Sequence, residues 1–207
     1  NGVTSNYRYD TAPYTRRLAR EMKEGVALFT QPPMPIKCAG APQKAMYLTC
    51  DAWRDRGVLG NIKVEFHNAG GVLFGVKEYV PALMRYIDRY GVDLHFESNL
   101  VAVDGEARRA TFREAGGEVT RDFDMLHVVP VQKAPQFIAD SPLADAAGYV
   151  EVDPATLQHV RHPNIFGLGD GASTPNAKTA AAVRKQAPIV AVNLLSVLRG
   201  GAPVAGY

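Results

Sequence analysis

Strand-like and helix-like segments alternate in the first half of the chain, and this alternation restricts the possible folds most strongly. Residues 26–30 form a short apolar run, and residues 62–66 carry apolar side chains at every second position. Residues 42–56 and 77–90 show apolar side chains at helical spacing instead. A strand–helix–strand–helix order brings the strands together in parallel, with helices packed against the sheet. The sequence therefore predicts an α/β fold built on a parallel sheet.

The strand at residues 62–66 has a mixed character. Lys63, Glu65 and His67 alternate with its apolar residues. Because successive side chains of a strand point to opposite faces, this pattern predicts that one face of the sheet is wetter than the other.

Residues 92–123 change to short alternating runs, beginning with Leu94 and Phe96. Asp104-Gly105 and Gly116-Gly117 interrupt these runs at positions suited to tight hairpin turns. The pattern predicts an antiparallel meander over this whole stretch.

The other predicted elements are shorter or more isolated. They are an amphipathic helix at 11–23, an apolar strand at 125–129, a loop with one helical turn at 131–143, a strand at 165–168 and a helix at 178–198. Pro188 lies inside the last helix and is expected to kink it near Arg184, because proline removes one backbone hydrogen bond. We divide the chain into a connecting segment and helix at 1–24, a dinucleotide-binding-like domain at 25–130, and a crossover with a C-terminal piece at 131–207.

The composition excludes several classes of function. The 207 residues are 46% apolar and 21% charged, which is ordinary for a globular protein with a sizeable core. A net charge of +2 without a block of Lys or Arg argues against a nucleic-acid partner. No uninterrupted apolar run approaches about 18 residues, so we expect no membrane-spanning segment.

The two cysteines, Cys38 and Cys50, make neither a disulfide framework nor a metal site, and we predict no bound metal. A reducing compartment is the default. Cys50 follows Cys38 by about three helical turns, or roughly 18 Å along a helix axis. A disulfide requires Cα atoms within about 7 Å, so the two should not pair and Cys50 is expected to be a packed core residue.

Cys38 has the sequence environment of a reactive thiol. It lies just before the predicted helix at 42–56, between Lys37 and Lys44. A helix N-terminus and nearby amines favour a thiolate over a thiol, and a thiolate is the form that attacks sulfur or an electrophilic cofactor. The alternative is an inert buried cysteine, which is common.

A tight turn near the C-terminus carries the second chemical signal. Residues 162–170 read as a short apolar strand that delivers Asp170, with Gly167 and Gly169, to a turn. A helix beginning Lys178-Thr179-Ala180 follows. Its N-terminus would present backbone N–H groups and a cation to a ligand that carries negative charge. The alternative is an ordinary turn aspartate that caps the next segment.

Several sequence blocks, taken in order, resemble the sulfide:quinone oxidoreductase family, particularly its mitochondrial-type branch within the FAD-dependent pyridine nucleotide-disulfide oxidoreductases. The blocks are residues 1–7, Lys37-Cys38-Ala39-Gly40-Ala41-Pro42-Gln43-Lys44, residues 74–77, 125–128, 144–148 and 166–170, and Lys178-Thr179-Ala180-Ala181-Ala182.

The resemblance implies a three-layer FAD/NAD(P)-binding, Rossmann-like domain with an antiparallel meander, and a C-terminal strand and long helix that return to the FAD domain. It implies FAD as cofactor, sulfide or a small sulfur compound as electron donor, and a quinone as acceptor. Cys38 matches the family's active cysteine. Gly169 and Asp170 match the residues that hold the flavin's sugar-alcohol chain, and Lys178, Thr179 and Ala180 match the helix start that faces the ring.

By the same comparison the chain looks like a middle-to-C-terminal fragment, because no Gly-rich phosphate loop occurs in residues 1–30. A front flavin-binding segment and a membrane-docking tail would belong to the parent. The parent is expected in the cytoplasm or on the inner membrane surface, with a homodimer as one option for its assembly, and the fragment alone is expected to be inactive.

The sequence departs from the family at one position. Gly171 occupies the place of the second redox cysteine, directly after Asp170. The standard two-cysteine mechanism is therefore in doubt, and a sulfur-sensing or inactive protein remains an alternative.

A flavin NAD(P)H dehydrogenase of the same superfamily is the other alternative. It would need a Gly-rich loop after residues 26–30 and an acidic residue at the end of the next strand. The loop instead reads Pro32-Pro33-Met34-Pro35, which lacks the row of backbone N–H groups that a pyrophosphate requires. Nicotinamide binding is therefore disfavoured.

Overall fold

The computed structural model describes residues 1–207, which form two compact units. Unit 1 comprises residues 1–34 and 40–131, and unit 2 comprises residues 35–39 and 132–207. The sequence-based division placed residues 35–39 within the domain at 25–130, whereas here this segment packs with the C-terminal part of the chain. Each unit is described separately.

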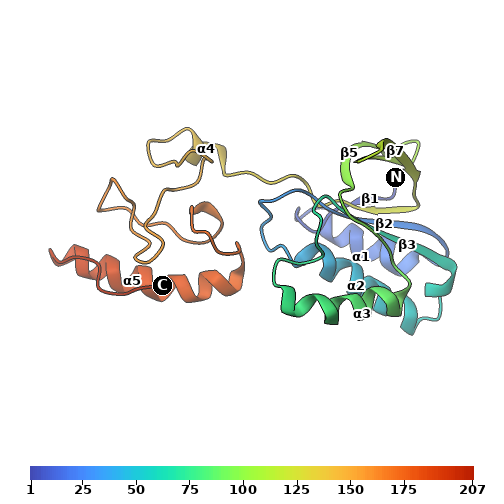
Figure 1. Ribbon diagram of the computed structural model, residues 1–207, viewed down its shortest axis with the longest axis horizontal. Helices are drawn as coiled ribbons and strands as arrows, with labels where there is room; N and C mark the ends of the chain where they lie inside the picture. Colours follow the sequence, from blue (N-terminus) through green and yellow to red (C-terminus); the bar gives the residue numbers. More distant parts are fainter. The chain divides into compact units, whose positions relative to one another are not determined.

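Unit 1 is built on a five-stranded sheet in the order β1-β8-β2-β3-β4 (Figure 1). Its strands are β1 (Val3–Thr4), β2 (Gly25–Gln31), β3 (Ile62–Asn68), β4 (Asp93–His95) and β8 (Met125–His127). All neighbouring pairs are parallel, which confirms the predicted parallel sheet. The run at Leu94 was assigned to the meander, and this is wrong: it pairs in parallel with Phe66 of β3. The β4 strand has only three residues, so its alternation could not identify its partner.

Three helices cover one face of this sheet (Figure 1). They are α1 (Ala12–Glu21), α2 (Ala41–Asp55) and α3 (Val80–Tyr90), and short 3₁₀ turns lie at Leu59–Asn61 and Lys77–Tyr79. Each of the three has a proline in its first turn, where a missing N–H costs nothing. Phe29, Trp53 and Phe66 are fully buried between helices and sheet. These helices match the predicted ones to within a few residues.

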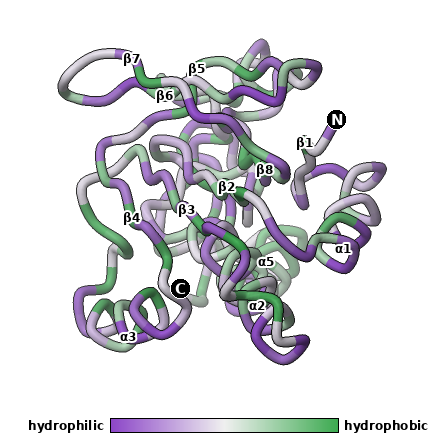
Figure 2. The backbone as a smooth tube through the Cα atoms, turned by 90° about the vertical axis from the view of Figure 1, so that its right-hand side faces the viewer, coloured by the Kyte–Doolittle hydropathy of each residue, from purple (hydrophilic) through white to green (hydrophobic).

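An antiparallel meander covers the other face, as Figure 2 shows. Its strands are β5 (Asn99–Asp104), β6 (Arg109–Glu114) and β7 (Gly117–Asp122). Phe112 of the meander packs in one cluster with Leu28 and Leu126 of the sheet. The antiparallel meander is thus confirmed for residues 99–122, and unit 1 has three layers.

The prediction of a wet face on β3 is wrong, because the meander covers that face. Glu65 and His67 are 2% and 1% exposed. His67 Nε2 lies 3.0 Å from Glu65 Oε2, and His67 Nδ1 lies 2.8 Å from Ser98 Oγ. Lys63 Nζ lies 2.7 Å from Glu65 Oε1. The polar alternation that suggested solvent instead supplies a buried hydrogen-bonded network between two layers.

Unit 2 has little regular structure apart from its last helix. It contains α4 (Gln136–Ala139), the 3₁₀ turn η3 (Gly169–Gly171) and α5 (Ala180–Leu198). The helical turn predicted in the loop at 131–143 is confirmed as α4. The strand predicted at 165–168 does not form. Only one isolated bridge, between Gln158 and Phe166, occurs there, because the neighbouring chain is itself a loop.

Helix α5 continues through Pro188 over 19 residues. By length and composition alone it could cross a membrane, and 11% of its most apolar window is buried inside the structure. From the sequence we expect no membrane-spanning segment, because that expectation considers only uninterrupted apolar runs. The mean hydropathy of α5 passes a less strict test. One such helix is weak evidence of a membrane span. Gln186 and Asn193, both fully buried, bind this helix to the loops of unit 2.

Gly169 forms a very close approach within unit 2. Its φ is +66°, and an added Cβ would lie 2.8 Å from Val183 Cγ2 of α5. The η3 turn therefore presses directly against the helix, and only glycine meets both demands without strain.

Stability should fall in mild acid. Burial, the largest cause in each case, lowers the pKa of His67 and of His127 to about 4. In the unfolded chain the histidine pKa values are about 6.5. Between about pH 4 and pH 6.5 the unfolded chain therefore binds more protons than the folded chain. Stability is retained above this window and decreases as the pH falls through it, by up to about 1.4 kcal/mol per pH unit for each histidine. Urea unfolding midpoints at pH 7 and pH 5 measure this difference.

The matched variants are His127→Gln and His162→Gln. His127 Nε2 accepts the Asn6 N–H at 3.3 Å, and a glutamine oxygen can accept in its place. His127→Gln should therefore reduce the acid loss, whereas His162→Gln, at a partly exposed position in unit 2, should leave it unchanged. An equal loss of stability in acid for the wild type, His127→Gln and His162→Gln would contradict the contribution assigned to His127.

Gly169→Ala should destabilise unit 2 by at least roughly 1–2 kcal/mol, because alanine resists the left-handed backbone and its methyl group meets Val183. Gly171→Ala is the control, since its Cβ would meet only the flexible end of Ile138 at 3.3 Å. Its effect should stay below about 1 kcal/mol. Thermal unfolding followed by circular dichroism compares the two, and equal midpoints would contradict the role given to Gly169.

Candidate functional site

Cys38 lies beside the residues that precede α5, although they are far apart in the sequence. Within unit 2, Lys37 forms a parallel bridge with Lys178. The Cys38 N–H donates to the Lys178 carbonyl oxygen at 2.6 Å, and the Lys37 N–H donates to Gln132 Oε1 at 2.8 Å. The segment at 35–39 is thus held against the start of α5. This contact brings together two of the sites predicted separately from the sequence.

The backbone of Cys38 is in the left-handed region, with φ of +56°. This conformation is uncommon for a residue with a Cβ and costs on the order of 1 kcal/mol. Its side chain is half-buried. Cys50, in contrast, is fully buried in unit 1, and burial raises the pKa of its thiol to about 12. The prediction of Cys50 as a core residue is confirmed, and it is chemically inert.

Asp170 lies on the exposed side of the η3 turn. The N–H of the preceding Gly169 donates to Gln186 Oε1 at 2.8 Å, which fixes the turn to α5. The carboxylate is therefore held by its backbone while its oxygen atoms remain accessible. Such a group can accept hydrogen bonds from the hydroxyls of a sugar-alcohol chain.

The start of α5 is capped and open. Thr179 is the N-cap residue, and its Oγ1 accepts the Ala182 N–H at 3.1 Å. Ala180 and Ala181 are exposed. Their backbone N–H groups lie at the positive end of a 19-residue helix and have only small side chains around them. This end of the helix suits a ligand that carries negative charge.

The ammonium group of Lys178 is directed into unit 2. It lies 4.1 Å from the centre of the Tyr149 ring and donates to the Ala172 carbonyl at 2.5 Å. Burial lowers the pKa of Lys178, and the charges of Asp170 and Asp145 oppose that shift. The amine thus supports the loop that carries Asp170. Its predicted contact with a flavin ring stays a prediction.

The residues present fit a flavin. An accessible carboxylate on a tight turn and a helix N-terminus with small side chains belong to the same unit, and the glycine turn approaches the helix more closely than a Cβ would allow. Gly169, Asp170, Thr179 and Ala180 would hold the sugar-alcohol chain and the pyrimidine end of the ring, where negative charge develops on reduction.

Gly171 follows Asp170 in the η3 turn, where the family resemblance places a second redox cysteine. Its carbonyl accepts the Val150 N–H at 2.8 Å, and its backbone φ is in the ordinary range. The nearest atom to an added Cβ is Ile138 Cδ1. The position therefore has room for a larger side chain after a small shift.

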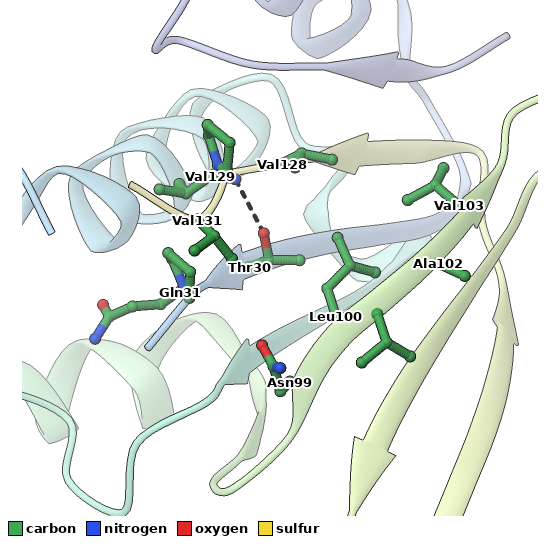
Figure 3. Close-up of a pocket in the computed structure, with 12 residues that line it drawn as sticks. Thr30, Gln31, Asn99, Leu100, Ala102, Val103, Val128, Val129 and Val131 are labelled. Atoms are coloured by element: carbon green, nitrogen blue, oxygen red, sulfur yellow. Dashed lines mark hydrogen bonds between the residues drawn. The ribbon is translucent and has the colours of Figure 1, made fainter. Parts of the chain in front are cut away.

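A cavity of about 220 Å³ in unit 1 lies at the carboxyl ends of β2 and β8, where Rossmann-like domains bind dinucleotides (Figure 3). Its lining is mainly apolar. The Thr30 hydroxyl is already engaged, because it accepts the Val129 N–H at 3.0 Å and donates to the His127 carbonyl at 3.3 Å. The residues that line it are Thr30, Gln31, Pro32, Asn99–Val103 and Val128–Val131. This cavity has none of the features of a pyrophosphate site.

Glu65, His67 and His95 place three potential metal-ligand atoms within 4.8 Å of one another. Lys63 and Arg121 already pair with Glu65. The two imidazole rings also stack with planes 5° apart, so their in-plane lone pairs cannot both point at one ion. This arrangement suits a structural network better than a metal centre.

His127 and His159 both have structural surroundings. His159 Nδ1 accepts the N–H groups of Arg161 and His162, which leaves Nε2–H to donate to the Leu143 carbonyl at 3.0 Å. Both ring nitrogens are therefore used within unit 2. His127 is 1% exposed and lies against Phe29.

Sequence reasoning missed Gln186 and Tyr149. Gln186 lies beside Arg184 and Lys185, so it reads as part of a solvated helix face. Tyr149 follows a small-residue stretch that gave no sign of the Lys178 contact. A signal was present only for Gln186, whose position one turn beyond Ala182 places it on the face of the helix that also carries Val183 and Ile189.

Comparison with known proteins gives consistent relatives. No protein-family model matches the chain. Curated mitochondrial sulfide:quinone oxidoreductases from Dictyostelium discoideum and Mus musculus are 43% and 39% identical over 95% and 99% of the chain. The corresponding protein of Schizosaccharomyces pombe is 42% identical over 89%. The chain spans 44%, 46% and 41% of these relatives, less than half of their length.

Solved structures share the fold. The sulfide:quinone oxidoreductase of Aquifex aeolicus matches 97% of the chain, and the chain covers 51% of that protein, with a TM-score of 0.80 and 16% identity. A water-forming NADH oxidase from Lactobacillus brevis matches 100% of the chain, and the chain covers 43% of it, with a TM-score of 0.65 and 13% identity. These structures establish a Rossmann-like FAD/NAD(P)-binding fold. The curated relatives, which are 39–43% identical to the chain, are all sulfide:quinone oxidoreductases, and this is the family that the chain resembles in sequence.

Proposed function

We propose that the chain is the part of an FAD-dependent oxidoreductase that receives electrons from sulfide or a related small sulfur compound and passes them to a quinone. The observation that carries the proposal is the hydrogen bond between the Cys38 N–H and the Lys178 carbonyl. Through this bond Cys38, the cysteine that is not fully buried, lies beside the start of α5. The start of α5 is where we propose that the flavin binds.

Each residue has a distinct role in this proposal. The Asp170 carboxylate accepts hydrogen bonds from the cofactor's sugar hydroxyls, and Gly169 allows the turn to lie against α5. Thr179 and Ala180 present the positive helix end, which favours the reduced, anionic cofactor. When bound, the flavin supplies the two-electron acceptor. The Gly-rich loop for its phosphates would come from the rest of the full-length protein.

Cys38 acts as the sulfur carrier. Its thiolate and the hydrosulfide sulfur form one S–S bond, two electrons leave to the acceptor, and the sulfide proton is released. Gly171 offers no thiol to take the sulfur from Cys38. The sulfane sulfur then leaves to a small external thiol, whose thiolate attacks the outer sulfur and restores the Cys38 thiolate.

The quinone implies contact with a membrane, because quinones dissolve in lipid. We place the full-length protein at an inner-membrane surface, in agreement with the word mitochondrial in the names of the curated relatives. Those names give no support to the cytoplasmic alternative. Homodimer formation remains a proposal.

Anaerobic bleaching of flavin absorbance in the full-length protein tests the reaction. Sulfide and NADH are added separately as donors. Bleaching by sulfide alone supports the proposal and means that the reaction proceeds with glycine at position 171. Bleaching by NADH alone would show that the protein is the flavin NAD(P)H dehydrogenase considered above. With neither donor active, a sulfur-sensing or inactive protein becomes the better interpretation.

Cys38→Ser should abolish sulfide-dependent flavin reduction, with a decrease of at least about a hundredfold in the bleaching rate, because a serine hydroxyl is not ionised near neutral pH. Stopped-flow absorbance measures the rate. Cys50→Ala is the matched control, since that thiol is fully buried in unit 1. A Cys38→Ser protein that bleaches at the wild-type rate would remove Cys38 from the mechanism.

Gly171→Cys should add a second thiol to the η3 turn, because an added Cβ meets only Ile138 Cδ1 at 3.3 Å. We expect sulfide-dependent turnover with less requirement for an external thiol. Turnover with quinone is measured with and without added thiol, and Gly171→Ser serves as the control of equal size. The same thiol dependence in both variants would contradict the role assigned to this position.

A further inference from the structure

Gln186, in the second turn of α5, uses both ends of its side-chain amide. It is fully buried. Its Oε1 accepts the Gly169 N–H at 2.8 Å, and its Nε2 lies 3.5 Å from Thr174 Oγ1 and 3.4 Å from Asn176 Oδ1. Because a backbone N–H can only donate, the amide oxygen must face Gly169. The orientation of the amide is therefore determined by its partners.

These bonds join the loop that carries Asp170 to the helix at two points. Gly169 lies at the beginning of that loop, and Asn176 lies shortly before the helix begins. Val183 touches the position of an added Gly169 Cβ, so the backbone of the turn already lies as close to α5 as glycine permits. Close packing of Gly169 against Val183 sets the distance between the turn and α5. The Gln186 amide sets the position of the turn along the helix axis.

We propose that Gln186 is a positioning residue that holds the Asp170 turn against the first turns of α5, so that the carboxylate and the helix N-terminus face the same ligand. This inference rests on the proposed flavin function of that site. Gln186 itself acts through the Gly169 N–H, and its effect on the ligand is indirect.

A purely packing role does not require an amide at this position. A methionine of similar length would fill the same space without two polar ends that must each find a partner in a buried site. The amide supplies what methionine cannot, a simultaneous acceptor for Gly169 and donor toward Thr174 or Asn176.

Asn193 provides a matched control on the same helix. It is also fully buried, and its side chain binds the Thr156 carbonyl and the backbone of Val204 and Ala205. Removing it should cost comparable stability, but its hydrogen bonds go to Thr156, Val204 and Ala205 and not to the Asp170 turn. Gln186→Met and Asn193→Leu therefore separate local positioning from general destabilisation.

The first experiment measures backbone amide hydrogen exchange and FAD binding in the full-length protein. In Gln186→Met, exchange at residues 169–171 should accelerate at least tenfold, and the FAD dissociation constant, from flavin fluorescence quenching, should rise about tenfold. Asn193→Leu should change neither at a temperature where it is folded. Equal exchange at residues 169–171 in both variants, or wild-type FAD affinity in Gln186→Met, would overturn the proposal.

The second experiment uses Gln186→Glu, which also covers the case in which Gln186→Met fails to fold. A neutral carboxyl group keeps one donor and one acceptor, whereas a carboxylate can only accept and adds a negative charge near the Asp170 turn. FAD affinity of this variant should approach that of the wild type in acid and decrease as pH rises, through one titration that the wild type lacks. A pH profile parallel to that of the wild type would overturn the proposal.

The two readouts distinguish the failure of this inference from the failure of the proposed function. If the wild-type full-length protein binds no FAD, the flavin function fails. Exchange at residues 169–171 still reports whether Gln186 holds the turn. If FAD binds and the exchange pattern does not respond to Gln186→Met, the inference alone fails.

Discussion

The candidate site depends on one backbone pairing, the hydrogen bond from the Cys38 N–H to the Lys178 carbonyl. Residues 35–39 interrupt unit 1 in the sequence, and this hydrogen bond helps to make them part of unit 2. Backbone groups make this contact, so the contact itself uses neither side chain. Lys178 uses its side chain to support the Asp170 loop.

The parallel sheet and its helices could be predicted because their signals are local and repeated. Prolines in the first turns and apolar side chains at regular spacing identify α2, β2 and β3. The errors concern what covers a strand, which strand it pairs with, and whether a short extended segment finds a partner at all. Glu65 and His67 look like solvent-facing residues until the meander is placed over them. The three residues of β4 and the extended segment at 165–168 carry too little pattern to reveal their partners.

The site residues divide in the same way. Cys38 and Asp170 stand in sequence contexts whose chemistry is readable, a thiol among amines and a carboxylate between glycines. Gln186 does not, because its function arises from a buried N–H seventeen residues away and not from its neighbours in the chain. Its spacing from Val183 and Ile189 places it on one face of the helix, but only the folded chain shows which N–H group its amide binds.

The left-handed backbone at Cys38 has a consequence for how such a protein can change over generations. Glycine adopts this conformation without strain, so replacement by glycine would relieve the backbone strain while it removes the thiol. Selection for folding and selection for sulfur chemistry therefore act in opposite directions at this one position. If demand for the reaction were relaxed, mutational drift would remove the nucleophile early and leave the scaffold intact.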